Sequence, residues 1–210
     1  FNGTSDAFDL DTNVQFLDKN LSDLFTNNGK TLIAAIRLNS AGTNSANIYD
    51  NAAIFADSPG GYFGLHFKTV ASVHSLHAYN WDGNADSCSV NVSLNTDYIV
   101  MVRHDGVNLN LSVLSGEAGA TRSDNSVASG NTTDMADTPR IGVNRSTVYW
   151  PGYIGELYFD NTELGITNTP LTDMIGRWLP AAAASNLFRL RTTQQKRGTR
   201  GISRGMRSGV

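Results

Sequence analysis

Residues 97–114, DYIVMVRHDGVNLNLSVL, carry the clearest structural signal in the sequence. An apolar run ends at the dipeptide Asp105-Gly106, and a strictly alternating run from Val107 to Leu114 follows it. Two strand patterns joined by Asp-Gly are the strongest local signal for a β-hairpin, because these residues accept the positive φ angles of its tight turn. The stretch therefore predicts two antiparallel strands joined by a turn at residues 105–106.

Further strand patterns lie on both sides of this hairpin. Residues 31–38 form an apolar run typical of a buried strand, and shorter strand patterns cover residues 61–67, 75–81, 140–143 and 153–159. Residues 169–178 begin with Thr-Pro and show a helical spacing of apolar side chains. Strands repeated about every 10–15 residues, with one short helix at the end, predict an antiparallel sandwich of two sheets.

Four segments together resemble a known family. Residues 1–10 (FNGTSDAFDL) combine an aromatic residue, a Gly turn, an acid and apolar residues, and residues 151–160 (PGYIGELYFD) lead through Leu164 into a helix that ends at Trp178-Leu179. With the strand at 32–38 and the hairpin at 98–114, they resemble the concanavalin A-like, laminin-G-like jelly-roll domains. The resemblance covers residues 1–180 and implies an all-β, two-sheet antiparallel jelly-roll sandwich with a short C-terminal helix. Because the same sandwich carries lectins, glycanases, adhesion modules and structural domains, it implies no single activity.

The charges are divided unevenly along the chain, which has 16 Lys and Arg and 19 Asp and Glu residues. Residues 187–210 contain no acid and seven basic residues, namely Arg189, Arg191, Lys196, Arg197, Arg200, Arg204 and Arg207. The preceding 186 residues keep nine basic and nineteen acidic side chains, so an acidic body of about −10 charges is joined to a basic arm of about +7. The arm has few apolar residues, so we expect residues 181–210 to form a linker and an extended arm that a partner orders.

An acidic body with a basic arm suits assembly, because the arm of one subunit can lie on the acidic body of the next. Asn-, Ser- and Gly-rich jelly rolls of this kind resemble virion surface proteins of tailed bacteriophages. That resemblance implies a non-enzymatic structural or capsid-decoration protein, a tail or fibre part, or an adhesion protein. In this hypothesis the arm binds other copies of the chain, or capsid or tail proteins, and the sandwich projects outward toward host glycans.

Other functions stay open. A carbohydrate-binding module of a larger secreted protein would be extracellular and would bind saccharide through the body alone. A glycanase with a degenerate site would depend on Glu156, and a nucleic-acid binder would show a steep salt dependence carried by the arm. No run of 18 apolar residues occurs, so we expect no association with a membrane.

The carboxylates argue against an enzyme. A retaining glycoside hydrolase needs two carboxyl groups about 5 Å apart, and the chain has three glutamates, Glu117, Glu156 and Glu163. Glu156 and Asp160 are evenly spaced and can face the same side of a strand, but the Glu-x-Asp-x-x-Glu pattern of glycanases in this superfamily is absent. We therefore expect no enzymatic activity and a structural role for Glu156.

Six residues are candidate ligand-binding groups. Trp81 ends a strand pattern, so its ring can stack on a sugar or, alternatively, close the edge of the core, and the same holds for Tyr149 and Trp150. The alternating oxygens of Asp82, Asn84 and Asp86 can converge on Ca²⁺ or form a plain polar turn. We expect no other cofactor.

The histidines and the single cysteine fit structural roles. None of the four histidines, His66, His74, His77 and His104, forms a metal-type pair, and we expect His66 and His77, which lie in alternating segments, to form hydrogen bonds on strand faces or in loops. Cys88 is the one cysteine, and a lone Cys in a β pattern predicts a small core residue.

Overall fold

The computed structural model describes residues 8–9, 29–41, 52–56, 62–81, 85–130, 140–141 and 150–180. The strands are β1 (Phe8–Asp9), β2 (Gly29–Leu38), β3 (Ala52–Ala56), β4 (Tyr62–Val70), β5 (Val73–Trp81), β6 (Ala85–Val92), β7 (Asp97–Asp105), β8 (Asn108–Ser115), β9 (Thr121–Ala128), β10 (Arg140–Ile141) and β11 (Gly152–Asp160). A 3-10 turn, Glu117–Gly119, joins β8 to β9, and helix α1 (Thr169–Trp178) follows β11. Among these residues, no helix is long and apolar enough to cross a membrane.

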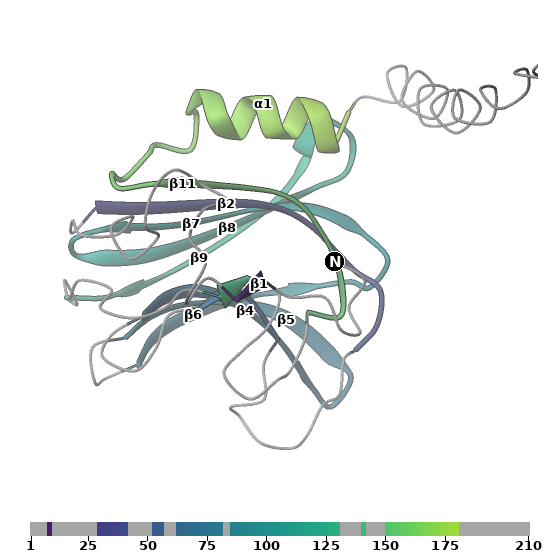
Figure 1. Cartoon of the computed structure of the whole chain (residues 1–210), viewed down its shortest axis with the longest axis horizontal. Coiled ribbons are helices and arrows are strands. Elements are labelled where there is room, and N and C mark those ends of the chain that lie inside the picture. The colour runs from purple at the N-terminus through teal and green to yellow at the C-terminus, as the bar shows by residue number, and fades with distance from the viewer. Residues whose placement is uncertain are drawn as a thin grey trace, which may run out of the picture.

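The strands form two sheets that lie face to face (Figure 1). One sheet has the order β1-β10-β3-β4-β5-β6 and the other has the order β11-β2-β7-β8-β9. All neighbouring strands are antiparallel. Helix α1 covers the outer side of the five-stranded sheet (Figure 1). The predicted all-β, two-sheet jelly-roll sandwich with a short helix is confirmed, whereas the arm at 181–210 lies outside the described residues.

Strands β7 and β8 form the hairpin that the sequence predicts. Gly106 takes a φ of 93°, the positive value that its turn position requires. The Asp105 carboxylate accepts hydrogen bonds from the backbone N–H groups of Val107 and Asn108, at 2.8 and 2.6 Å. Both members of the Asp-Gly pair therefore stabilise the turn, and β8 begins one residue later than its sequence pattern.

Two apolar clusters hold the fold together. Leu32 and Ile36 of β2 belong to the larger cluster between the sheets, whereas Ile33 of the same strand packs with Leu171 and Met174 of α1. Strand β2 is thus buried on both faces, which explains its continuous apolar run. Full burial of each large apolar side chain contributes about 1.5–3 kcal/mol, so the helix is a firm part of the fold.

Helix α1 begins with a polar cap. The Asn168 side chain accepts a hydrogen bond from the backbone N–H of Leu171 at 2.7 Å. Pro170 sits in the first turn, where its missing N–H costs no helical hydrogen bond. The helix ends at Trp178, and the next residue, Leu179, is buried. The cap and the buried residues fix where Trp178 meets strand β11.

Candidate functional site

The C-terminal end of α1 lies over an irregularity in β11. The register of β11 against β2 shifts between Ile154 and Glu156, which leaves Gly155 as the extra residue of a β-bulge. The Trp178 indole contacts Gly155 so closely that a Cβ atom there would lie less than 3 Å from three carbons of the ring. Only glycine allows this contact without a shift of the helix or the ring.

The Glu156 carboxylate fixes the Trp178 ring. Its carboxylate accepts a hydrogen bond of 2.8 Å from the indole Nε1–H of Trp178. It also accepts two from the Arg177 guanidinium, 3.1 Å from Nε and 2.6 Å from Nη2. The Arg177 hydrogen bond, helped by that of Trp178, lowers the pKa of the Glu156 carboxyl. The carboxylate is therefore charged at neutral pH, and the indole has its only polar atom satisfied while 42% of the residue stays exposed.

Three side chains on neighbouring strands lie in a row on the face of the five-stranded sheet where Trp178 lies. Tyr153 of β11 lies opposite Arg37 of β2, and Arg37 lies opposite Asp97 of β7. Tyr153 is 55% exposed. Arg37 Nη1 donates to Asp97 Oδ1 at 3.4 Å, and the two side chains keep 40% and 57% of their surface exposed. This long, solvent-exposed pair leaves donor and acceptor capacity for another molecule.

A pocket of about 190 Å³ lies among these groups. Trp178, Tyr153, Arg37 and Asp97 line it together with Ala35 and Gly155. The pocket therefore combines aromatic and apolar surface with one cation and one anion. An apolar concavity with a few convergent polar groups is the usual composition of a small-molecule site.

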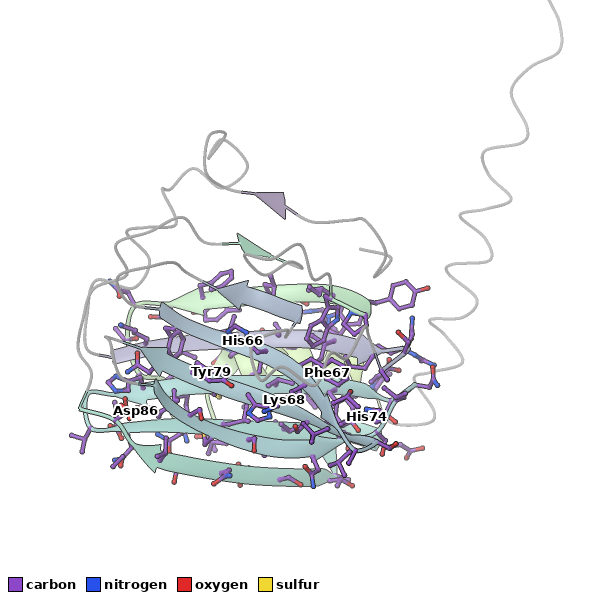
Figure 2. The ribbon with its side chains drawn as sticks, turned by 90° about the horizontal axis from the view of Figure 1, so that it is seen from below. His66, Phe67, Lys68, His74, Tyr79 and Asp86 are labelled. Atoms are coloured by element: carbon purple, nitrogen blue, oxygen red, sulfur yellow. The ribbon has the colours of Figure 1, made fainter. Side chains whose placement is uncertain are left out.

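The outer face of the six-stranded sheet carries a different cluster. His66 and His77 lie opposite each other on β4 and β5, and the ring of Tyr79 contacts both, with centroids 4.9 and 6.0 Å away. Figure 2, seen from this side, shows His66, Tyr79 and Lys68 on these neighbouring strands. Burial lowers the pKa of His66 to about 3, with His77 adding to the effect, and lowers that of His77 to about 4, with Lys68 adding. Both imidazoles are therefore neutral at pH 7.

The other histidines also have structural partners. His74 Nδ1 lies 2.9 Å from Thr69 Oγ1, and His104 Nε2 lies 2.9 Å from the Ser129 carbonyl inside the sandwich. His77 Nε2 lies 2.8 Å from a serine hydroxyl, that of Ser75. The contact of His77 agrees with the hydrogen-bonding role expected for it from the sequence. In the described ranges, no group of three or more His, Cys, Asp or Glu side chains could hold a metal ion.

The structure overturns one of the predicted sugar-binding residues. Trp150 is only 1% exposed and packs in the core between the sheets, with its ring edge-on to Phe67 at 6.1 Å. The prediction for Trp150 is wrong because the ring fills the core, as in the alternative interpretation. Cys88 is buried in the same core, as predicted.

Most other predicted site residues cannot be placed by their side chains. Tyr149, Asp82 and Asn84 lie outside the described residues, as do the seven basic residues of the arm. Trp81 is described by its backbone, which pairs with Ala85. Asp86 is partly buried in β6, opposite Asn80. The calcium site therefore stays a prediction.

Tyr153 and Trp178 fall in a predicted strand and a predicted helix, and their sequence patterns do not show that they share a pocket. One sequence signal does point to this pocket. A glycine inside a strand pattern, here Gly155, marks a bulge or a close approach by another group. The group that approaches is set by the docking of α1, which adds a long-range contact that no local pattern shows.

Solved structures similar to this fold share little of its sequence. Full-length tailspike protein 2 from Escherichia coli O157:H7 bacteriophage CAB120 aligns over 76% of this chain and 23% of its own, with 12% identity and a TM-score of 0.56. The enzymatically active domain of tailspike protein 2 from bacteriophage CBA120 aligns over 73% and 25%, with 12% identity and a TM-score of 0.51. The LG1-3 region of the laminin alpha2 chain aligns over 68% and 30%, with 14% identity and a TM-score of 0.49.

These similarities concern the fold alone. The chain spans about a quarter of the length of the tailspike chains it resembles. No protein-family model and no curated protein matches the sequence. At 12% identity, a common sandwich implies no common activity. These structures support the jelly-roll fold that the sequence implies.

Proposed function

We propose that this chain is a non-enzymatic carbohydrate-binding sandwich that serves in adhesion, with its sugar site in the pocket beside Trp178. The observation that carries this proposal is the exposed indole, held by Gly155 and Glu156, next to the exposed pair of Arg37 and Asp97. A pyranose has an apolar C–H face and a rim of hydroxyl groups. The indole suits the face, and the ion pair suits the rim.

Rigidity favours binding at this site. An aromatic ring that is already fixed loses little conformational entropy when a ligand stacks on it. Trp178 is fixed by the hydrogen bond to Glu156 and by its contact with Gly155. The exposed ring is therefore already fixed in position before a ligand binds, unlike a surface side chain that rotates freely.

The carboxylates support binding over catalysis. Glu156 and Asp160 face the same side of β11, but four residues of a strand separate them by about 13 Å. Glycosidases need carboxyl groups about 5 Å or about 6.5–9.5 Å apart. Glu156 is moreover engaged by Arg177 and Trp178, and Glu163 by Arg103 at 2.7 Å. These carboxylates have structural roles that agree with a non-enzymatic sandwich.

The charge of the arm supports a second part of the proposal, anchoring in a larger assembly. The arm at residues 187–210 carries seven basic residues against an acidic body. It suits an acidic surface, such as another copy of the chain or a capsid or tail protein, with the sandwich on the virion surface. Light scattering at low and high salt should show salt-sensitive association of the full chain and none for a chain ending at Ser185. The same oligomeric state for both chains would contradict self-assembly through the arm.

A glycan array tests the carbohydrate site directly. The full chain should bind a subset of saccharides, and Trp178→Ala should reduce that binding about tenfold or more, because stacking on the ring is lost. Val107→Ala is the matched control, since Val107 is exposed in the turn at the other end of β7. Unchanged binding by Trp178→Ala, with both variants folded by circular dichroism, would contradict the proposal.

A further inference from the structure

We propose that the pocket selects one neutral pyranose residue that presents two adjacent hydroxyl groups, and that it disfavours acidic sugars. This inference rests on the proposed carbohydrate-binding function and specifies its ligand. It follows from three properties of the pocket: its volume, its balance of charge, and the place of the ion pair beside the aromatic ring.

The volume limits the ligand to a single ring. Pockets that enclose drug-sized ligands have volumes of about 300–1,000 Å³, whereas this one has about 190 Å³. Trp178 stands on one side of it, at the end of α1, and Tyr153 comes from strand β11. The pocket thus receives a terminal residue or a side branch of a glycan, and the rest of the chain stays in solvent.

The charges in and behind the pocket balance. Arg37 is paired with Asp97, and Glu156 behind the indole is paired with Arg177. A sugar carboxylate that bound Arg37 would displace Asp97 or lie close to it, which places two like charges together. The acidic body, with nineteen acids against nine bases in residues 1–186, repels anions further. The pocket therefore suits a neutral sugar better than a uronic or sialic acid.

The Arg37–Asp97 pair fits two neighbouring hydroxyl groups. The guanidinium offers only donors and the carboxylate only acceptors, and their paired atoms lie 3.4 Å apart. One hydroxyl can accept from Arg37 while the adjacent hydroxyl donates to Asp97. When the C–H face of the sugar ring stacks on Trp178, the Arg37–Asp97 pair can bind the hydroxyl groups at the edge of that sugar ring.

Titration of the full chain with matched methyl glycosides tests this inference. The probes are methyl glucoside, galactoside and mannoside, each compared with the uronate that differs from it only at C6. Two-dimensional NMR measures the dissociation constants at low salt. At least one neutral glycoside should bind about tenfold or more tightly than its uronate, because the uronate adds an unpaired charge near Asp97.

Asp97→Asn separates the role of charge from that of the fold. It should weaken the neutral glycoside about tenfold, because a charge-assisted hydrogen bond is lost. It should also reduce the preference over the uronate. Asp124→Asn is the matched control, since Asp124 pairs with Arg122 on β9 with similar exposure, 50% and 40%, and it should change neither value.

The outcomes distinguish this inference from the proposed function. A uronate that binds as tightly as its neutral partner, with both lost in Trp178→Ala, overturns the selectivity and keeps the carbohydrate site. Glycans that bind through Trp178 only as longer chains, with no methyl glycoside bound, overturn the single-ring ligand. Binding of no saccharide on the array or in solution overturns the function itself, and the inference with it.

Discussion

The outer faces of the two sheets carry similar residues and use them in opposite ways. On the six-stranded sheet, His66, His77 and Tyr79 pack against one another, and burial keeps both imidazoles neutral. On the five-stranded sheet, α1 covers only part of the face and leaves Trp178 exposed beside a charged pair. Rings that pack against one another are closed to a ligand, whereas a ring that is held in place but left exposed can bind one.

Acid should lower the stability of the fold through the two buried histidines of the six-stranded sheet, and this is the largest effect that we expect. The pKa values of His66 and His77 fall from 6.5 in the unfolded chain to about 3 and about 4 in the fold. The unfolded state therefore binds more protons below pH 6.5, and the free energy of unfolding falls as pH drops toward 4. Between pH 6.5 and 5 the loss is at most about 2 kcal/mol for each histidine.

Urea unfolding at several pH values measures this effect. His77→Gln removes one of the titrating groups, so its stability should fall less steeply with acid than that of the wild type. Parallel pH profiles for the two proteins would contradict the assignment.

The pKa of Glu156 is lowered, so its carboxylate stays charged at pH 5, and the affinity of the folded protein for saccharide should be the same at pH 7 and pH 5.

Gly155→Ala should displace the exposed Trp178 ring on the five-stranded sheet. The new Cβ atom would overlap the Trp178 ring, so the helix or the ring must move. We expect a loss of about 1–3 kcal/mol in the free energy of unfolding, together with loss of saccharide binding. Gly165→Ala is the control, because nothing lies within 4 Å of a Cβ atom there. Equal stability and binding for the two variants would show that the ring does not rest on Gly155.

Glu156→Ala tests whether a fixed ring is what distinguishes the five-stranded face. The ring would keep its place on α1 and lose the hydrogen bond to its indole nitrogen. Because binding must then order the side chain, we expect an affinity about two- to tenfold weaker. Stability should change by no more than about 1 kcal/mol, as for an exposed ion pair. Calorimetric titration measures the first quantity and urea unfolding the second; unchanged affinity would contradict the role of rigidity.

Gly176→Ala should have the smallest effect, a gain in the stability of α1. Gly176 lies inside α1, and a Cβ atom there meets nothing within 4 Å. Alanine should therefore stabilise the helix by about 0.5–1 kcal/mol without changing the pocket. A higher midpoint of urea unfolding with unaltered saccharide affinity is the expected result, and weaker affinity would mean that the helix must bend to admit the ligand.

Local patterns predict the centre of this fold and miss its edges. Strands β2 and β7 carry long apolar runs, and β8 alternates after the Asp-Gly turn, so the sequence predicts all three. Strand β9 was missed because its sequence, TRSDNSVA, is almost wholly exposed and polar, and its pairing with β8 alone makes it a strand. Strand β6 was missed although Cys88, Val90 and Val92 alternate toward the core.

The site was less predictable than the fold, as the tryptophans show. Trp150 lies just before β11 and Trp178 ends α1, and both sequence contexts permit a buried or an exposed ring. Trp150 fills the core between the sheets, while Trp178 lies on Gly155 at the surface. Both outcomes depend on contacts between residues far apart in the sequence, Trp150 with Phe67 and Trp178 with Gly155.

The most direct test of the carbohydrate site is the indole N–H region of the NMR spectrum during titration with the preferred methyl glycoside. The chain has three tryptophans and hence three indole signals, which single Trp→Phe variants assign. The signal of Trp178 should move, and that of buried Trp150 should stay in place. Movement of the Trp81 signal with that of Trp178 unchanged would contradict a sugar site beside Trp178 and place the sugar at the end of β5 instead.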